Sequence, residues 1–330
     1  MSARKWTAWT PAQSKIEMIQ SKIQNPKSKI DSPQTQSFLM RRLAEAGIKP
    51  RTKIGQNFLI DLNLQGLLVR TAQLESRDVV LEVGTGTGSV TAMMAPQVAA
   101  VVSVEIDRQL FQLASEELHG FDNVHMLQAD ALETKHRLNR AALEAVSREL
   151  AAAPDREFKL VANLPYDAAT PILANLLALD RPPRTMTVTI QKELADRLVA
   201  RPGSKDFGAL SRGVQSQCRT EIVRVMPPAV FWPRPKVFSA IVHIVLVDEL
   251  RNRMADRAFF HEFIHAMFLH RRKFIRSELM IVAKNRLDKA AVDRILADAG
   301  ISPKIRAEQL GVDEMLRLSE AVRTALNGVA

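Results

Sequence analysis

The stretch Val79 to Gly88, with the sequence VVLEVGTGTG, decides the fold of this chain. Its first five residues indicate a strand, and Gly84, Gly86 and Gly88 follow at alternate positions before a helical pattern begins. Glycines let the backbone approach a ligand closely, and the start of the helix behind them favours negative charge. Strand, glycine loop and helix in this order predict an α/β fold with a ligand site at the loop.

The next two predicted strands, at 100–106 and 124–128, each lead to an acidic side chain. Glu105 comes about 20 residues after the glycines, where an acidic side chain can accept hydrogen bonds from ribose hydroxyls. Asp130 can meet the edge of a base or its exocyclic amine. Together with the glycine loop, these two residues predict a nucleoside-containing cofactor.

A fourth predicted strand, Lys159 to Ala162, is followed by Asn163, Leu164, Pro165 and Tyr166. The amide oxygen of Asn163 and the carbonyl of Leu164 can both accept hydrogen bonds from one NH2 group. Pro165 fixes the local backbone, and Tyr166 offers a ring for stacking. This group suits a flat molecule with an amino group, such as a nucleobase, although a plain strand-to-helix turn with a buried tyrosine is the alternative for four residues alone.

Three more strands are predicted at 186–191, 222–225 and 240–247, which brings the expected sheet to seven strands. Residues 131–157 are expected to form a helical insertion, mostly at the surface. A helix is expected at 34–46, with Gly47 as its C-cap.

The chain is expected to divide into three parts. Residues 1–33 resemble a mobile basic arm, in which Trp6 and Trp9 dock on the body or stack on nucleotides. Residues 34–250 contain the predicted sheet, and residues 251–330 are helical throughout, which predicts a small all-helical domain.

The positive charge lies at the two ends of the chain, although the net charge of the 330 residues is +10. Residues 1–50 carry nine Lys and Arg against three Asp and Glu, and residues 251–330 carry fifteen against ten. This pattern favours an enzyme body flanked by phosphate-contacting surfaces. The single cysteine, Cys218, excludes an internal disulfide framework, and neither a membrane span nor a secretory signal is recognisable, so a cytoplasmic protein is expected.

Residues 261–265 match the H-E-x-x-H pattern of zinc proteases. We expect no metal here, because the pattern is short and His270 lies on another face of the helix. The same helix leads into Arg271, Arg272 and Lys273, with Arg276 one turn later, and this cluster is predicted to contact RNA phosphates, a solvated helix end being the alternative.

The glycine loop favours S-adenosylmethionine over NAD. The dinucleotide fingerprint places its third glycine one position later, where this chain has Ser89. A site that grips an amine makes methyl transfer the more coherent chemistry.

Eight motifs occur in an order and spacing that resemble the ribosomal RNA adenine dimethyltransferases, over roughly residues 34–320. They are Lys53 to Asp61, Leu81 to Gly88, Val104 to Asp107, Asn163 to Tyr166, Gln191 to Glu193, Phe207 to Ser211, Pro233 to Ser239 and Arg271 to Lys273. Within that family the chain most resembles the bacterial small-subunit (16S) group linked to kasugamycin sensitivity. Thr85, where the family usually has proline, is a departure.

This resemblance implies a Rossmann-like class I methyltransferase domain with a mostly parallel sheet, followed by an all-helical domain. It implies methylation of two adjacent adenines in a hairpin loop near the 3′ end of small-subunit rRNA, in the immature subunit, by a monomer. Donor contacts are implied for Asn57, Leu59, Gly84, Gly86, Gly88, Glu105, Asp130 and Asn163, and target contacts for Asn163, Leu164, Pro165, Tyr166 and Phe207.

Two other functions stay open at this point. One is methylation of large-subunit rRNA, as in the macrolide-resistance enzymes, and the other is a non-catalytic role in ribosome assembly. The intact Asn163 motif and glycine loop favour catalysis.

Overall fold

The computed structural model describes residues 41, 43–44, 47–48, 56–269, 273–283 and 286–328. The predicted arm at 1–33 lies outside these residues, as does most of the helix predicted at 34–46. Gly47, its expected C-cap, has a φ of +66° and donates its amide hydrogen to the Ala44 carbonyl.

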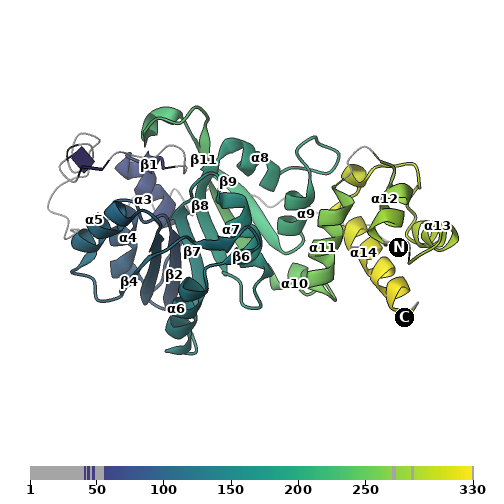
Figure 1. Cartoon of the computed structure of the whole chain (residues 1–330), viewed down its shortest axis with the longest axis horizontal. Helices are drawn as coiled ribbons and strands as arrows, with labels where there is room; N and C mark the ends of the chain where they lie inside the picture. The colour runs from purple at the N-terminus through teal and green to yellow at the C-terminus, as the bar shows by residue number, and fades with distance from the viewer. Residues whose placement is uncertain are drawn as a thin grey trace, which may run out of the picture. The chain divides into compact units, whose positions relative to one another are not determined.

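A seven-stranded sheet, in the order β4-β3-β2-β7-β8-β11-β9, forms the centre of the described chain (Figure 1). The first five strands in this order are parallel, and β11 runs antiparallel to both of its neighbours. The strands are β2 (Asp78–Val83), β3 (Ala100–Glu105), β4 (Val124–Gln128), β7 (Glu157–Asn163), β8 (Thr185–Gln191), β9 (Cys218–Met226) and β11 (Ser239–Leu246). This confirms the predicted α/β fold with a mostly parallel sheet.

The strand order reverses between β2 and β7. After β2 the chain adds β3 and β4 outward on one side, and then returns to add β7 on the other side. Open α/β sheets bind ligands at the carboxyl ends of their strands, beside such a reversal. The glycine loop follows β2 and Asn163 ends β7, so the two main motifs of the sequence meet at this point.

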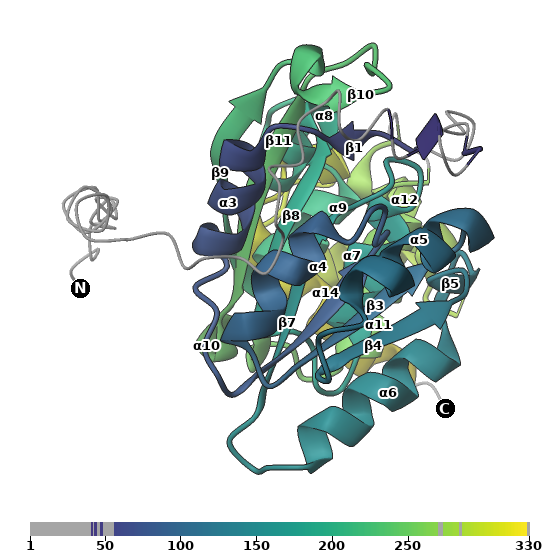
Figure 2. The same ribbon diagram turned by 90° about the vertical axis from the view of Figure 1, so that its left-hand side faces the viewer.

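Helices cover both faces of the sheet, because successive side chains of a strand point to opposite faces. Val79 and Leu81 pack against one layer of helices, whereas Val80 packs against the other. Figure 2 shows helices on both sides of the sheet. The first layer contains α6 (Arg140–Ala151), α7 (Ala169–Ala178) and α8 (Lys192–Leu198), and the second contains α3 (Leu62–Thr71) and α4 (Ser89–Met94). α5 (Arg108–Leu118) follows β3.

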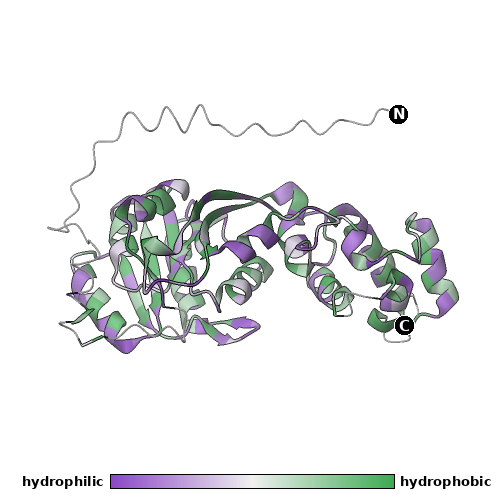
Figure 3. Ribbon diagram, turned by 90° about the horizontal axis from the view of Figure 1, so that it is seen from above, coloured by the Kyte–Doolittle hydropathy of each residue, from purple (hydrophilic) through white to green (hydrophobic). Residues whose placement is uncertain are grey.

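Beyond β11, every described element is a helix, as predicted. These are α10 (Asp248–Arg251), α11 (Arg257–Met267), α12 (Ile275–Val282), α13 (Lys289–Asp298), the short 3-10 helix η4 (Ala307–Gln309) and α14 (Val312–Asn327). Their apolar side chains, such as Phe260, Phe263 and Leu279, form a core of their own. Figure 3 shows hydrophobic and hydrophilic residues on the same helices, as expected of amphipathic helices.

Arg212 of α9 (Ala209–Gln215) links the sheet to this helical segment. Its buried guanidinium lies 4.0 Å from the ring centre of Phe207 and 4.6 Å from that of Phe268. Burial lowers its pKa to about 10. It donates hydrogen bonds to four backbone carbonyls, those of Phe207, Gly208, Ala307 and Leu310.

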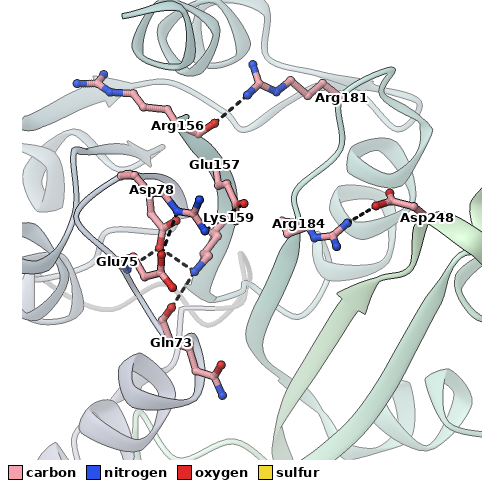
Figure 4. A network of polar contacts seen from close by, with 10 residues as sticks. Gln73, Glu75, Asp78, Arg156, Glu157, Lys159, Arg181, Arg184 and Asp248 are labelled. Carbon is pink, nitrogen blue, oxygen red and sulfur yellow. Dashed lines mark hydrogen bonds and ion pairs between the residues drawn. The ribbon is translucent and has the colours of Figure 1, made fainter. Parts of the chain in front are cut away.

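The amino ends of β2 and β7 share a buried ion pair (Figure 4). The Lys159 ammonium lies 2.7 Å from the Asp78 carboxylate and also donates to the Gln73 carbonyl at 2.7 Å. Since both side chains lie at the edge opposite the glycine loop, we assign this network a structural role.

Two sequence-based predictions need correction. Residues 131–157 are mostly at the surface, as predicted, but they are not helical throughout, because they begin with a hairpin of β5 (Leu132–Thr134) and β6 (Arg137–Leu138). α6 also buries Ala142, Ala145, Val146 and Leu150 in the main core. β9 (Cys218–Met226) is longer than the predicted 222–225. The prediction is too short because this strand forms the exposed edge of the sheet and carries polar side chains. Residues 231–232 form a further short strand, β10 (Phe231–Trp232), which pairs with β1 (Phe58–Leu59).

No helix in the described part of the chain is both long and apolar enough to cross a membrane.

Candidate active site

The glycine loop needs its glycines for two reasons. Gly84, Gly86 and Gly88 have φ values of +82°, +59° and +79°, a region that residues with a Cβ rarely adopt. A Cβ on Gly86 would also lie 3.3 Å from the Phe58 ring, which is closer than an ordinary contact, whereas one on Gly84 would make an ordinary contact of 3.6 Å with the Pro165 ring. The loop is therefore a cradle of bare backbone, placed between Phe58 of the N-terminal motif (Lys53 to Asp61) and Pro165 of the Asn163 motif (Asn163 to Tyr166).

Glu105 stands at the carboxyl end of β3 and holds this cradle in place. One of its carboxylate oxygens accepts a hydrogen bond from the Gly86 amide at 2.9 Å, and the other accepts one from the Asp107 amide at 2.9 Å. Burial raises its pKa, and these two backbone bonds act in the opposite direction. Ile106 provides a third backbone bond to this carboxylate. Each carboxylate oxygen has two acceptor sites, so Glu105 retains acceptor capacity for a ribose hydroxyl.

Glu82 supports the loop from beneath and was not singled out from the sequence. Its buried carboxylate accepts hydrogen bonds from the hydroxyls of Thr91 and Ser103, and Ser103 is also bonded to the Thr85 hydroxyl at 2.6 Å. Burial raises the pKa of Glu82 to about 7. A carboxylate within an otherwise apolar strand was the signal that could have drawn attention to it.

The Asn163 motif, Asn163 to Tyr166, lies at the carboxyl end of β7. The Asn163 amide nitrogen donates to the Asn57 carbonyl at 2.8 Å, which leaves its amide oxygen as the acceptor. The described residues provide no donor to the Leu164 carbonyl. The half-buried Tyr166 shares a hydrogen bond of 2.6 Å with the Ser239 hydroxyl at the start of β11, and burial raises its pKa. Two acceptors and a fixed aromatic ring thus stand together at the end of β7.

The N-terminal motif reaches the same place. Leu59 is buried, and its carbonyl accepts a hydrogen bond from the side chain of Gln65, which in turn accepts one from the Ser89 hydroxyl. Gln65 therefore connects β1 to the first residue of α4, directly behind the glycine loop. Asn57 is in contact with Asn163, as described above.

Two predicted site residues are placed differently from the rest. Asp130 is exposed and accepts a hydrogen bond from the Leu132 amide at 2.9 Å, so its carboxylate caps the turn after β4. Phe207 is only 2% exposed and packs against Arg212, so in this conformation its ring has no open face for a base. Its predicted stacking role therefore has no support from the geometry.

The predicted phosphate-binding cluster is described only in part. Arg271 and Arg272 lie outside the described residues, whereas Lys273 is exposed. Arg276 lies 2.5 Å from the Asp293 carboxylate, without the alignment of a hydrogen bond. This ion pair between α12 and α13 reduces the availability of Arg276 for a phosphate.

The two histidines of the H-E-x-x-H pattern do not share an environment. His261 is partly buried and its ring nitrogen lies 3.4 Å from the Gln217 amide, whereas His265 is exposed. Within the described residues, no three His, Cys, Asp or Glu side chains come together as a metal site would require.

The groups at the carboxyl edge of the sheet fit S-adenosylmethionine, the cofactor expected from the sequence. A bare-backbone cradle suits a closely packed ligand, and Glu105 has acceptor capacity for a ribose. The Asn163 and Leu164 oxygens, one strand away, suit an amine that receives a methyl group.

Three comparisons with known proteins agree with this geometry. The family model described as "Ribosomal RNA adenine dimethylase" matches residues 47–323. A protein named ribosomal RNA small subunit methyltransferase A from Halothermothrix orenii is 36% identical over 277 residues, which is 83% of this chain and 89% of that protein. One of the same name from Lactiplantibacillus plantarum is 39% identical over 280 residues, 84% of this chain and 92% of that protein.

A solved structure shares the fold. The crystal structure of a dimethyladenosine transferase from Plasmodium falciparum matches with a TM-score of 0.64 and 21% identity, over 78% of this chain and 94% of that chain. The structure of the 23S rRNA methyltransferase ErmE matches with a TM-score of 0.55 and 24% identity, over 81% of this chain and 99% of that chain. At these identities the likeness concerns the fold.

Proposed function

The chain belongs to the ribosomal RNA adenine dimethylase family, and we propose that it transfers methyl groups from S-adenosylmethionine to N6 of adenines in small-subunit rRNA. The observation that carries this proposal is the meeting of the glycine cradle with the Asn163 motif, where Gly84 packs against Pro165. The names of the two relatives favour the small subunit over the large one.

The donor would lie along the carboxyl ends of β2 and β3. Gly84, Gly86 and Gly88 would face its methionine part, and Glu105 would accept hydrogen bonds from its ribose. Asp130 would have to turn from the Leu132 amide to reach the adenine. When bound, S-adenosylmethionine supplies an electrophilic methyl group on a positively charged sulfur.

The chain's own residues would hold the target adenine by its amine. The Asn163 amide oxygen and the Leu164 carbonyl each accept one N6 hydrogen, which draws the nitrogen away from planarity and makes its lone pair more available. Tyr166, held by Ser239, stacks on a base that is splayed out of its loop. Catalysis then comes mainly from positioning and from exclusion of water, because the attacking nitrogen loses its proton as or after the bond forms.

The helical segment is the proposed RNA-binding part. We assign 34–250 to methyl transfer and 251–330, with Arg271, Arg272 and Lys273, to phosphate contact, and the basic arm at 1–33 to a further RNA contact. Two adjacent adenines in a hairpin loop near the 3′ end of the rRNA are the proposed target. The enzyme would act as a monomer on immature small subunits, and therefore in the cytoplasm.

The test is transfer of labelled methyl groups from S-adenosylmethionine to small ribosomal subunits that lack the modification, followed by nucleoside analysis. We expect N6,N6-dimethyladenosine in the small-subunit RNA. Label in large-subunit RNA alone would contradict the proposed substrate. Binding of the donor without any transfer would contradict the proposed activity and favour an assembly factor.

A further inference from the structure

The segment 233–238, with the sequence PRPKVF, borders the candidate site at both of its ends. The residue before it, Trp232, pairs with Phe58, and their rings stack with centres 6.3 Å apart. Phe58 in turn lies against Gly86 of the glycine cradle. The residue after the segment, Ser239, holds the hydroxyl of Tyr166 at 2.6 Å. The segment therefore runs from the donor side of the site to the ring proposed to stack on the target.

Two apolar side chains of this segment are open to solvent. Val237 is 44% exposed and Phe238 is 52% exposed. Among the described residues, the other large apolar side chains with comparable exposure stand singly in the sequence. Since an exposed phenylalanine costs solubility and contributes nothing to the core, this pair calls for a partner that covers it.

The same segment carries two cations that have no counterion among the described residues. Arg234 and Lys236 are exposed, the segment contains no acidic residue, and neither cation forms an ion pair within the described chain. Some exposed arginines elsewhere, such as Arg253 with Asp313, do form such pairs. Pro233 and Pro235 fix two of the six backbone φ angles, so the segment loses little conformational freedom when it binds a partner.

We propose that segment 233–238 binds the single-stranded RNA beside the target adenine. Phe238 stacks on the base next to the target, and Arg234 and Lys236 neutralise the phosphates of that strand. A rigid segment with an exposed aromatic ring and unpaired cations has the composition of a single-strand binding surface, and its charge complements RNA. The proposal rests on the proposed function, under which the neighbouring base is the second of two adjacent adenines.

The binding test uses a synthetic RNA hairpin with two adjacent adenines in its loop. Base stacking on an aromatic ring is lost in Phe238→Ala, for which we expect a dissociation constant about tenfold higher, whereas Phe238→Trp should bind as well as the wild type. The double variant Arg234→Gln/Lys236→Gln should reduce the slope of log K against log salt by about 1.4, since each single-strand phosphate contact contributes about 0.7.

A matched control removes the same charge elsewhere. Arg219 pairs with Val245 at the end of β11 far from Ser239, and Arg148 lies in the last turn of α6, which leads to the amino end of β7. Both are exposed, and Arg148→Gln/Arg219→Gln should leave the salt slope unchanged. Val225→Ala, on the outer strand β9 and 40% exposed, is the control for a lost apolar side chain.

A second readout is the fluorescence of the base next to the target adenine. With 2-aminopurine in place of the second adenine, binding to the wild type should quench fluorescence by stacking, and Phe238→Ala should lose this quenching while Phe238→Trp retains it. Each variant must bind S-adenosylmethionine like the wild type, which shows that the site is folded.

Unchanged RNA affinity, salt slope and quenching in the Phe238 and Arg234/Lys236 variants would overturn the inference. Equal losses of RNA affinity or of salt slope in the control variants would overturn it as well. These tests measure RNA binding, so their outcome is independent of methyl transfer. The proposed function would fail in a different way, namely if the wild-type protein binds the donor but transfers no methyl group to small-subunit RNA.

Discussion

The buried carboxyl group of Glu82 makes the stability of this protein depend on pH. In the folded chain, burial raises its pKa from 4.5 to about 7. The folded state therefore binds a proton more readily than the unfolded state does. The stabilisation that the protonated form provides is complete below pH 4.5 and is lost as the pH rises through about 7.

Replacement of Glu82 by glutamine removes this titration. The amide oxygen of glutamine can still accept hydrogen bonds from Thr91 and Ser103, and it carries no charge at any pH. Between pH 5 and pH 8 the free energy of unfolding of the wild type should fall by about 2.5 kcal/mol relative to that of the variant, because one pKa unit corresponds to about 1.4 kcal/mol. With an unfolding entropy of about 0.7 kcal/mol/K for a chain of this length, this difference shifts the thermal midpoint by about 4 °C.

The assay is thermal unfolding of both proteins, followed by circular dichroism at pH 5, 6, 7 and 8. Other groups titrate too: burial lowers the pKa of His243 to about 4, so its contribution is lost as the pH falls from 6.5. The difference between variant and wild type cancels these contributions. That difference should rise with pH by about 4 °C in favour of Glu82→Gln.

The control is Gln112→Ala on the exposed side of α5, which removes no titratable group and should give a difference that does not change with pH. A constant difference for Glu82→Gln as well would contradict this prediction, because Glu82 would then titrate alike in the folded and unfolded states. The midpoints of the two proteins can also differ by an amount that is the same at every pH. That amount would reflect only how well the hydrogens of the new amide fit the site.

Three further changes test other parts of the structure. Gly86→Ala, which places a Cβ 3.3 Å from the Phe58 ring at a φ of +59°, should weaken S-adenosylmethionine binding about tenfold in calorimetry, whereas Gly120→Ala, with no atom within 4 Å, should not. Arg212→Met leaves four carbonyls without their donor, and the thermal midpoint should fall by about 4 °C, a loss of about 3 kcal/mol. Replacing residues 271–273 by glutamine should weaken RNA binding and flatten its salt dependence, and an unchanged slope would identify the cluster as a solvated helix end.

The central features of the fold could be predicted because they depend on local sequence. The apolar run of β2, the glycines after it and the acidic end of β3 each follow from patterns within a few residues. The edge strand β9 was predicted too short, because the alternating polar residues of an exposed strand resemble a loop. The buried face of α6 could not be predicted from 131–157, because the alanines of this segment conceal its apolar character.

The parts of the site that escaped prediction depend on contacts between distant residues. Gln65 connects Leu59 to Ser89, and Ser239 holds Tyr166 across 73 positions of the chain. No local pattern encodes such pairs. Phe207 illustrates the opposite case, since the motif suggested an exposed ring and Arg212 covers it.

The most direct measurement compares donor binding with methyl transfer in Asn163→Ala. The amide oxygen of Asn163 is one of two acceptors proposed for the target amine, and its nitrogen is already bonded to Asn57. We predict that the variant binds S-adenosylmethionine nearly as the wild type does and forms no methylated adenosine in small-subunit RNA. Turnover at the wild-type rate in that variant would contradict the assignment of the site.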